Sequence, residues 1–269
     1  MRRPCYHRRM PDRDSLALDA YQLIPRVLHR VMEPDLTTVV LGRDSGTPLV
    51  ERMPGSASPA AQPGALRIVD SDSLASASQL LAADAIAVMA PRKMAELVPE
   101  VRRLVELGVA AIGLDLAPLA DGPPFGKVAF RPRTREDLAE LRAAAGRPLW
   151  LFGVGGGADA EVAAEAGVEG IVVTRAVGRR IGAPAVIDIL PEVLDAVAGM
   201  LTIVAGGHVR DGIDVLRYLA VGAELVVVDG ERPLPALAGE LAYAMRLTGC
   251  ATLADVSYDI LFAPLFSEQ

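Results

Sequence analysis

The sequence predicts an α/β fold, a (β/α)8 TIM barrel built as a single domain with an N-terminal helical extension. Eight short runs rich in Val, Ile and Leu are apolar on both faces, as is typical of strands in a parallel sheet. Helical patterns alternate with these runs, and the length of 269 residues is close to the usual size of about 250 residues. An open doubly wound sheet is the alternative. Eight strands without the pattern of a second domain favour the barrel.

Each predicted strand is bounded by turn or helix signals. The strands, in chain order, are Thr47–Met53, Ala65–Asp70, Ala85–Ala90, Ala110–Leu116, Pro148–Val154, Gly170–Thr174, Leu201–Gly206 and Ala223–Asp229. Apolar residues at three-and-four spacing predict the helices Ser73–Ala83, Pro91–Gly108, Arg135–Gly146, Asp159–Gly167, Ala185–Gly199, Asp211–Gly222 and Leu234–Thr248. The link Pro54–Gly64 is the least helical connection.

The N-terminal part is expected to lie outside the barrel. A helix is predicted around Ser15–Met32, after a tail of residues 1–14. We therefore divide the chain into residues 1–34, a tail with a helix, and residues 35–269, the barrel.

Composition excludes several classes of protein. The chain is 51% hydrophobic, which excludes global disorder, and no apolar run reaches the roughly 20 residues of a membrane helix. The net charge of -7 argues against a nucleic-acid partner. Two cysteines suffice neither for a disulfide framework nor for a four-cysteine zinc site, and the basic N-terminus lacks the apolar segment of a secretory signal. We expect a cytoplasmic protein without a membrane contact or a metal.

The sharpest cluster of candidate binding residues is the run AGGHVRDGID at the end of the seventh strand. Gly206 and Gly207 let the backbone approach a ligand, the next helix start attracts an anion, and Arg210 adds a charged fork. Gly230 and Arg232 follow the eighth strand, and loops after strands seven and eight often bind phosphate in such barrels. We favour a phosphate site over glycines that only cap strands and an Arg210 that is a surface cation.

Candidate acid–base residues also lie at strand ends. Of three histidines only His208 does so, and it is either a general base or a hydrogen-bonded loop residue. Asp70, Asp115 and Asp229 are acids, bases or metal ligands, or they cap helices. The run Gly153–Gly157 lacks the Lys and Ser/Thr of a P-loop and the spacing of a dinucleotide fingerprint, which favours a loop or close packing.

Several stretches resemble the FMN-dependent α-hydroxy-acid oxidase and dehydrogenase family. The resemblance is good over residues 135–261 and thin before them. It rests on PLWLFG, AGVEGIVV, GAPAVIDIL, AVGA and LTGCATLADV, and on DLTTVVLGRDSGTP before the first strand. It implies a (β/α)8 barrel with FMN at its carboxyl-terminal face.

The resemblance also implies roles for single residues. Arg179 matches the arginine that holds the substrate carboxylate, and Arg210 matches the phosphate arginine. Gly206 and His208 take the places of the aspartate and the second glycine of the phosphate motif. Gly230 and Arg232 match a Gly-Arg pair only across an insertion. Ala176 stands where the family has its histidine base. Phe152, Ala65 and Leu114 stand where the family has a lysine, a glutamine and a threonine that contact the flavin.

Loss of the base alone usually costs about two to four orders of magnitude in rate. We therefore predict a divergent, shortened family member that is not an ordinary 2-hydroxy-acid oxidase. Three functions remain open. The first is an FMN-dependent oxidoreductase for a small anionic substrate, with Arg179 at a carboxylate and His208 or Asp115 as acid or base. The second is a flavin-free isomerase, lyase or cyclase. The third is a non-catalytic subunit. Family members often self-assemble, so we expect a homo-oligomer or a hetero-oligomer with a paralogue.

Overall fold

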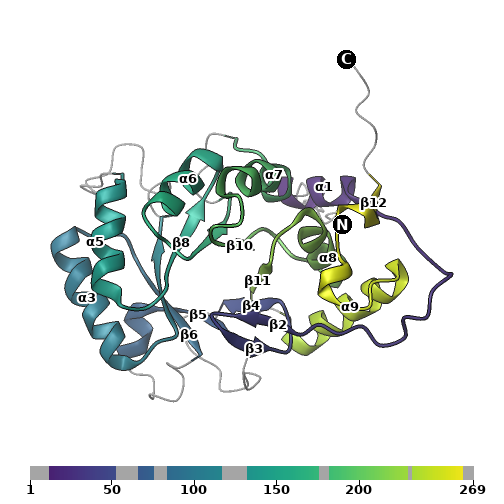
Figure 1. Cartoon of the computed structure of the whole chain (residues 1–269), viewed down its shortest axis with the longest axis horizontal. Coiled ribbons are helices and arrows are strands. Elements are labelled where there is room, and N and C mark those ends of the chain that lie inside the picture. Colours follow the sequence, from purple (N-terminus) through teal and green to yellow (C-terminus); the bar gives the residue numbers. More distant parts are fainter. Residues whose placement is uncertain are drawn as a thin grey trace, which may run out of the picture.

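Eight parallel strands form a closed barrel (Figure 1). The structure is a computed structural model and describes residues 12–52, 66–75, 84–116, 132–175, 182–229 and 232–262. The strands follow chain order around the barrel, and β11 pairs with β4 to close it. They are β4 (Leu49–Arg52), β5 (Arg67–Asp70), β6 (Ala85–Met89), β7 (Ala111–Asp115), β8 (Leu149–Val154), β9 (Gly170–Val173), β10 (Thr202–Ala205) and β11 (Leu225–Asp229). The predicted fold and all eight predicted strands are confirmed.

Helices lie around the outside of the strands, with α3 and α5 on the left and α8 and α9 on the right of Figure 1. They are α3 (Met94–Leu107), α5 (Arg135–Ala145), α6 (Gly157–Glu165), α7 (Val186–Val197), α8 (Gly212–Val221) and α9 (Leu234–Thr248). The start of α5 shows why the local sequence folds this way. Thr134 and Asp137 form a capping box there, and Gly146 ends the helix in the left-handed region.

One predicted helix is described only in part. The segment Ser71–Ala75 forms a short 3-10 helix, η1, where a longer helix over Ser73–Ala83 was expected. Residues 76–83 lie outside the described residues, as does the link Pro54–Gly64.

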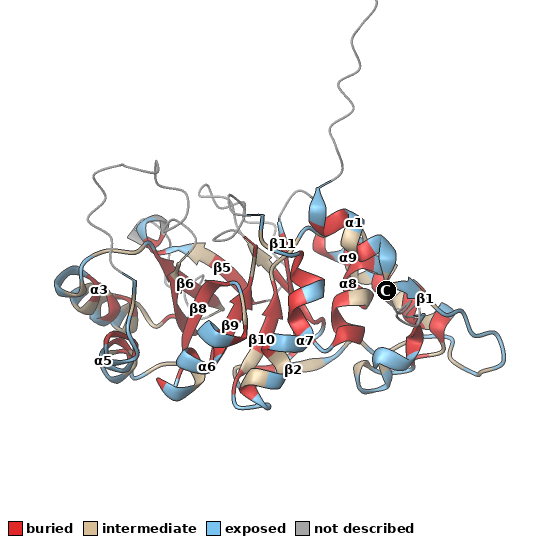
Figure 2. Ribbon diagram, turned by 90° about the horizontal axis from the view of Figure 1, so that it is seen from above, coloured by how far each residue is buried: buried red, intermediate tan, exposed pale blue. Residues whose placement is uncertain are grey.

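The inside of the barrel is filled by two aromatic side chains from β8. Trp150 and Phe152 are 1% and 3% exposed. A Cβ atom on Gly170 would lie 2.6 Å from the Trp150 ring, and one on Gly113 would lie 2.7 Å from the Phe152 ring. Large residues on one strand therefore fit because the neighbouring strands carry glycine, as close packing requires. A second apolar layer fills the space between strands and helices, where buried residues dominate (Figure 2).

A hairpin that was not predicted covers one end of the barrel. It consists of β2 (Thr38–Val40) and β3 (Arg43–Ser45), which pair antiparallel. Val40 and Leu41 pack into the interior cluster together with Leu66 and Ala110, the residues just before β5 and β7. The hairpin therefore closes the amino ends of the strands and leaves the carboxyl ends for a site.

The predicted N-terminal helix is wrong beyond Ala20. Helix α1 spans Arg13–Ala20, and the chain then continues as β1 (Gln22–Leu23) and an extended segment. Pro25 explains the difference, because it has no N–H to donate and it disfavours the helical conformation of the preceding residue. Strand β1 pairs antiparallel with β12 (Leu261–Phe262), which places the N-terminal segment beside the C-terminal one.

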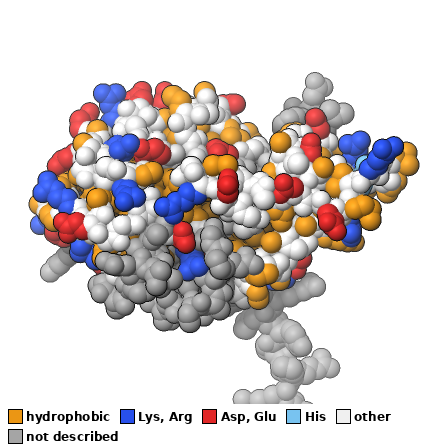
Figure 3. Space-filling view, turned by 60° about the horizontal axis from the view of Figure 1, so that its bottom comes forward, with side chains coloured by type: hydrophobic (Ala, Val, Ile, Leu, Met, Phe, Trp, Pro, Cys, Tyr) orange, Lys and Arg blue, Asp and Glu red, His pale blue; other side chains and the backbone are white. Residues whose placement is uncertain are grey.

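The surface carries both signs of charge. Acidic and basic side chains are mixed on the face shown in Figure 3. Within the described part of the chain, no helix is long and apolar enough to cross a membrane.

Candidate active site at the carboxyl end of the barrel

A cavity of about 230 Å³ opens at the carboxyl ends of the strands. Its described walls come from β4, β5, β7, β8, β9 and β11, from the loop after β10, and from the start of α1. Four of the predicted site residues line it: Asp115, Gly206, Gly207 and His208. The structure thus brings together residues that lie far apart in the sequence, at the place where barrels of this class hold their active sites.

The carboxylate of Asp115 is paired across the cavity wall. Arg52 Nη2 lies 3.7 Å from Asp115 Oδ2, and the Asp115 side chain is only 16% exposed. His208 lies at the rim and is exposed. Both side chains can exchange a proton with a molecule in the cavity. Asp229 also lines the cavity, whereas Asp70 does not.

Close packing explains both glycines after β10. A Cβ atom on Gly206 would lie 2.7 Å from Thr174 Cγ2, and one on Gly207 would lie 2.0 Å from Tyr218 Oη. Both positions therefore need glycine for the fold itself. The same lack of side chains leaves backbone next to the cavity, so packing and ligand binding are compatible explanations.

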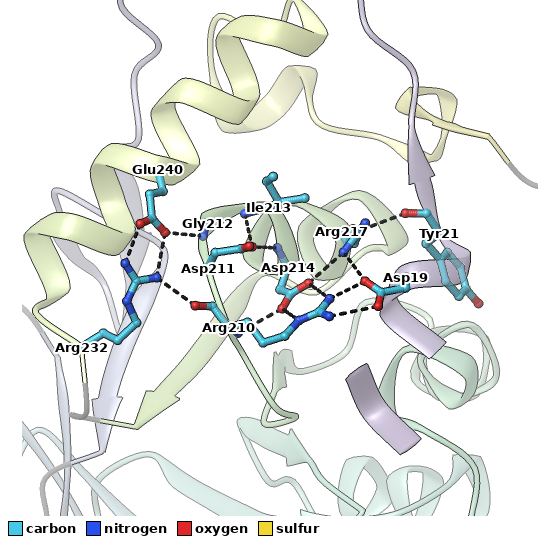
Figure 4. A network of polar contacts seen from close by, with 10 residues as sticks. All are labelled: Asp19, Tyr21, Arg210, Asp211, Gly212, Ile213, Asp214, Arg217, Arg232 and Glu240. Atoms are coloured by element: carbon cyan, nitrogen blue, oxygen red, sulfur yellow. Dashed lines mark hydrogen bonds and ion pairs between the residues drawn. The ribbon is translucent and has the colours of Figure 1, made fainter. Parts of the chain in front are cut away.

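Arg210, two residues after His208, lies in a cluster of ion pairs (Figure 4). Its guanidinium donates to Asp214, which is fully buried, and to both oxygens of Asp19 on α1. Arg217 binds the same two carboxylates. Hydrogen bonds from Arg210 lower the pKa of Asp19. Burial alone would raise the pKa of Asp214, but hydrogen bonds from Arg210 and Arg217 hold it below its usual value.

The start of α8 is capped by acidic side chains. Asp211 accepts from the amides of Ile213 and Asp214. Glu240 on α9 accepts from the amide of Gly212 and also pairs with Arg232, which donates to the carbonyl of Arg210. These internal acceptors therefore take the helix-start donors that an anion would use.

The N-terminal helix contributes cavity residues that the sequence did not indicate. Asp12 and Asp14 line the cavity with Arg175, which follows β9. Asp14 accepts from the amide of Val186 at the start of α7, and burial raises its pKa. Arg175 follows a strand end, but nothing in the sequence linked it to two carboxylates more than 160 residues away.

Comparison with known proteins gives this cavity its context. A model of the FMN-dependent dehydrogenase family matches residues 119–263, which is more than half of the chain. The chain belongs to this family. The resemblance seen in the sequence is thereby confirmed.

Several hydroxy-acid oxidases are similar to this family member. L-lactate oxidase from Roseobacter sp. (strain GAI101) is 38% identical over 151 residues, covering 51% of this chain and 40% of that protein. 2-Hydroxyacid oxidase 1 from Mus musculus is 38% identical over 130 residues, covering 43% of this chain and 35% of that protein. The matched part is thus well under half of the length of these two relatives.

The fold of the family member is also found in solved structures. A mandelate oxidase variant with a C4a-OH-FMN adduct superposes with a TM-score of 0.74 at 25% identity, covering 90% of this chain and 88% of that chain. A second variant of mandelate oxidase, with 2-hydroxy-phenylacetamide, has the same TM-score and identity.

The structure places two of the predicted replacements in the flavin site differently. Phe152 lines the cavity, and a bulge at Gly153 (φ 96°) follows it. Leu114 does not line the cavity, because its side chain packs in the layer between strands and helices. Successive residues of a strand face opposite sides, so Gly113 and Asp115 are the inward positions of β7. The expectation for Leu114 is therefore wrong.

Some predicted positions lie outside the described residues. These are Ala65, Ala176, Arg179 and Gly230. Among the residues that are described, no group of three or more His, Cys, Asp or Glu has the arrangement of a metal site.

Proposed function

We propose that the chain is an FMN-dependent oxidoreductase that acts on a small substrate bearing a carboxylate, and that it differs from an ordinary 2-hydroxy-acid oxidase. The observation that carries the proposal is the cavity at the carboxyl end of the barrel. Gly206, Gly207 and His208 border it, and Arg210 follows them within the segment that the family model matches.

The described residues fit the anionic end of FMN. Gly206 and Gly207 offer backbone without side chains, and Arg210 offers a guanidinium. Asp19 binds this guanidinium in the two-pronged geometry that phosphate also adopts on arginine, and its side chain is 56% exposed. An incoming phosphate can therefore exchange with Asp19, while Asp214 keeps Arg210 in place. Arg232, which in the free protein pairs with Glu240, is a further phosphate contact that the family resemblance implies; its predicted partner Gly230 lies outside the described residues.

The inner end of the cavity differs from the flavin site that the family resemblance implies. When bound, FMN supplies an acceptor for a hydride. Phe152 offers an apolar ring where the resemblance implies a lysine, so it cannot stabilise negative charge on a reduced flavin. This difference supports an altered activity rather than the loss of FMN binding.

The chain's own polar residues supply the remaining roles. Arg179 binds the substrate carboxylate, as the family resemblance implies. His208 or Asp115 takes the proton of a substrate hydroxyl, because both line the cavity. Arg52 holds the Asp115 carboxylate in place through their ion pair.

A titration with FMN tests the cofactor. We expect the flavin absorbance to change on binding and Arg210→Ala to weaken binding about tenfold or more, because a charge-assisted bond is lost. Arg217→Ala is the matched control, since Arg217 binds the same carboxylates but is not a predicted phosphate contact. Equal weakening in both variants, or a protein that takes up no FMN, would refute this part of the proposal.

Turnover tests the reaction. We expect the FMN-loaded protein to oxidise lactate, glycolate and mandelate at rates at least about a hundredfold below those of an active family member assayed alongside, because no histidine occupies the position of the base. Rates equal to those of that relative would show an ordinary 2-hydroxy-acid oxidase instead.

A further inference from the structure

Arg175 is a buried positive charge on the wall of the cavity. The residue is 8% exposed and lies directly after the end of β9. Its Nη2 donates to Asp12 Oδ1 at 2.6 Å, and its Nε lies 3.4 Å from Asp14 Oδ2. Nε is buried and makes no hydrogen bond with any described group. Two carboxylates therefore balance the charge of the guanidinium, but its Nε has no hydrogen-bond acceptor among the described residues.

The two carboxylates that balance Arg175 are held differently. Asp14 is 4% exposed and also accepts from the amide of Val186, so its position is fixed from two sides. The Asp12 side chain is 42% exposed and is held by its ion pair with Arg175. Of the two, Asp12 is the carboxylate that can leave.

The position of Asp12 in its helix makes departure easy. Asp12 is the N-cap residue of α1, yet its side chain accepts no hydrogen bond from the first turn. Aspartate at an N-cap normally accepts from an amide of that turn and stabilises the helix. Binding Arg175 takes the carboxylate away from that role, and release from Arg175 would restore it.

The charges of the described cavity lining favour an exchange when an anion binds. The described lining carries four carboxylates, from Asp12, Asp14, Asp115 and Asp229, and two guanidinium groups. Arg52 is paired with Asp115, and Arg175 with Asp12 and Asp14. Among these described groups the carboxylates outnumber the guanidinium groups, so they disfavour an added anion, whereas an anion that replaces Asp12 at Arg175 leaves the local charge unchanged.

We propose that Arg175 binds the carboxylate of the substrate and that Asp12 takes the place of this carboxylate in the free protein. The inference rests on the proposed function, because it names the group that receives the carboxylate-bearing substrate. Arg175 then acts besides Arg179, and α1 is part of the substrate site. The ligands that fit are small monocarboxylates, because one guanidinium position is exchanged.

Binding of lactate and of its neutral analogue lactamide tests the proposal by calorimetry and thermal shift. We expect Asp12→Asn to bind lactate about tenfold more tightly than the wild type, with lactamide unchanged, because the internal competitor is removed. Arg175→Leu should remove the preference for lactate over lactamide.

Asp188→Asn is the control for a change in the docking of α1. Asp188 on α7 accepts from Tyr21 at the end of α1 and does not line the cavity. Lactate affinity should stay within twofold in this variant. If Asp12→Asn and the wild type bind lactate equally, or if Asp188→Asn gains as much as Asp12→Asn, the proposal is wrong.

The outcome separates this inference from the proposed function. If the protein binds FMN but Arg175→Leu does not change its affinity for lactate, the inference is wrong and the proposed function is unaffected. A protein that prefers lactate through Arg175 but takes up no FMN overturns the proposed oxidoreductase activity and leaves the carboxylate site standing.

Discussion

Asp19 and Arg210 form a two-pronged ion pair although 191 residues separate them in the chain. Arg210 Nη1 lies 3.0 Å from Asp19 Oδ2, and Nη2 lies 2.6 Å from Asp19 Oδ1. The pair ties the helix before the barrel to the loop after β10. Because Asp214 also binds this guanidinium, the three groups and Arg217 form one electrostatic unit (Figure 4).

Loss of the buried carboxylate in this unit should destabilise the fold strongly. Asp214→Asn removes the buried one of the two carboxylates that Arg210 and Arg217 share, so that only the exposed Asp19 still binds both of them among the described residues. We expect the free energy of unfolding in urea to fall by about 3–5 kcal/mol, as for a broken buried ion pair. Asp195→Asn on the exposed face of α7 is the control and should change it by less than about 0.5 kcal/mol. Equal effects of the two variants would show that this group of ion pairs contributes little to the free energy of unfolding.

The contribution of Asp214 should depend on pH in the acid range. Its pKa in the folded protein is lowered from 3.8, so its ionised form stabilises the fold above that value. We expect the stability difference between the wild type and Asp214→Asn to be constant from pH 7 to about pH 5. It should shrink as the pH falls below 3.8. Urea unfolding at a series of pH values measures this, and a difference that grows on acidification contradicts the assignment.

Two glycines of the α8–α9 pair should respond to alanine in opposite directions. A Cβ atom on Gly212 would lie 2.2 Å from the Leu241 amide nitrogen, which cannot move away because it belongs to the backbone of α9. We expect Gly212→Ala to cost about 1–3 kcal/mol or more in unfolding free energy. Gly239 lies within α9 with nothing within 4 Å of its Cβ position, so Gly239→Ala should gain about 0.5–1 kcal/mol. Thermal and urea unfolding of both variants decide between these signs.

Tyr21 should ionise late in an alkaline titration. Burial, together with the charge of Asp188, raises its pKa to about 12. The protonated phenol therefore stabilises the folded state below pH 10, and this contribution is lost as the pH rises from 10 to 12. The phenolate absorbance of the wild type minus that of Tyr21→Phe should show a step near pH 12. A step near pH 10 would mean that the phenol is solvated.

The barrel was predictable because its strands are buried on both faces. Runs such as those of β8 and β9 carry apolar residues without alternation, and this local signal is independent of distant partners. The hairpin β2–β3 was missed because its strands are three residues each and β3 contains Arg43 and Asp44. The helix was predicted too long beyond Ala20 because Pro25, which cannot donate a helical hydrogen bond, was not taken as a stop.

The site was predictable only where it follows strand ends. Asp115 and the residues after β10 were found in that way, because parallel strands bring their carboxyl ends to one side of the sheet. Asp12 and Asp14 gave no such signal, since they reach the cavity through the docking of α1. Whether the Leu114 side chain faces the inside or the outside of the barrel depends on strand register, because a shift of one residue turns every side chain of a strand to the opposite face.

The pairing of β1 with β12 makes the cavity depend on the order in which the chain is synthesised. Ile24 donates to the carbonyl of Ile260, and Arg26 to that of Leu247, so the segment after α1 is held by residues 247–262. Segments fold as they leave the ribosome, starting from the N-terminus. Helix α1 is thus made early but acquires these partners only late in translation. Until then, the segment after α1 lacks these hydrogen-bond partners, and the position of α1 depends on contacts with earlier residues, such as the bond from the Val186 amide to Asp14.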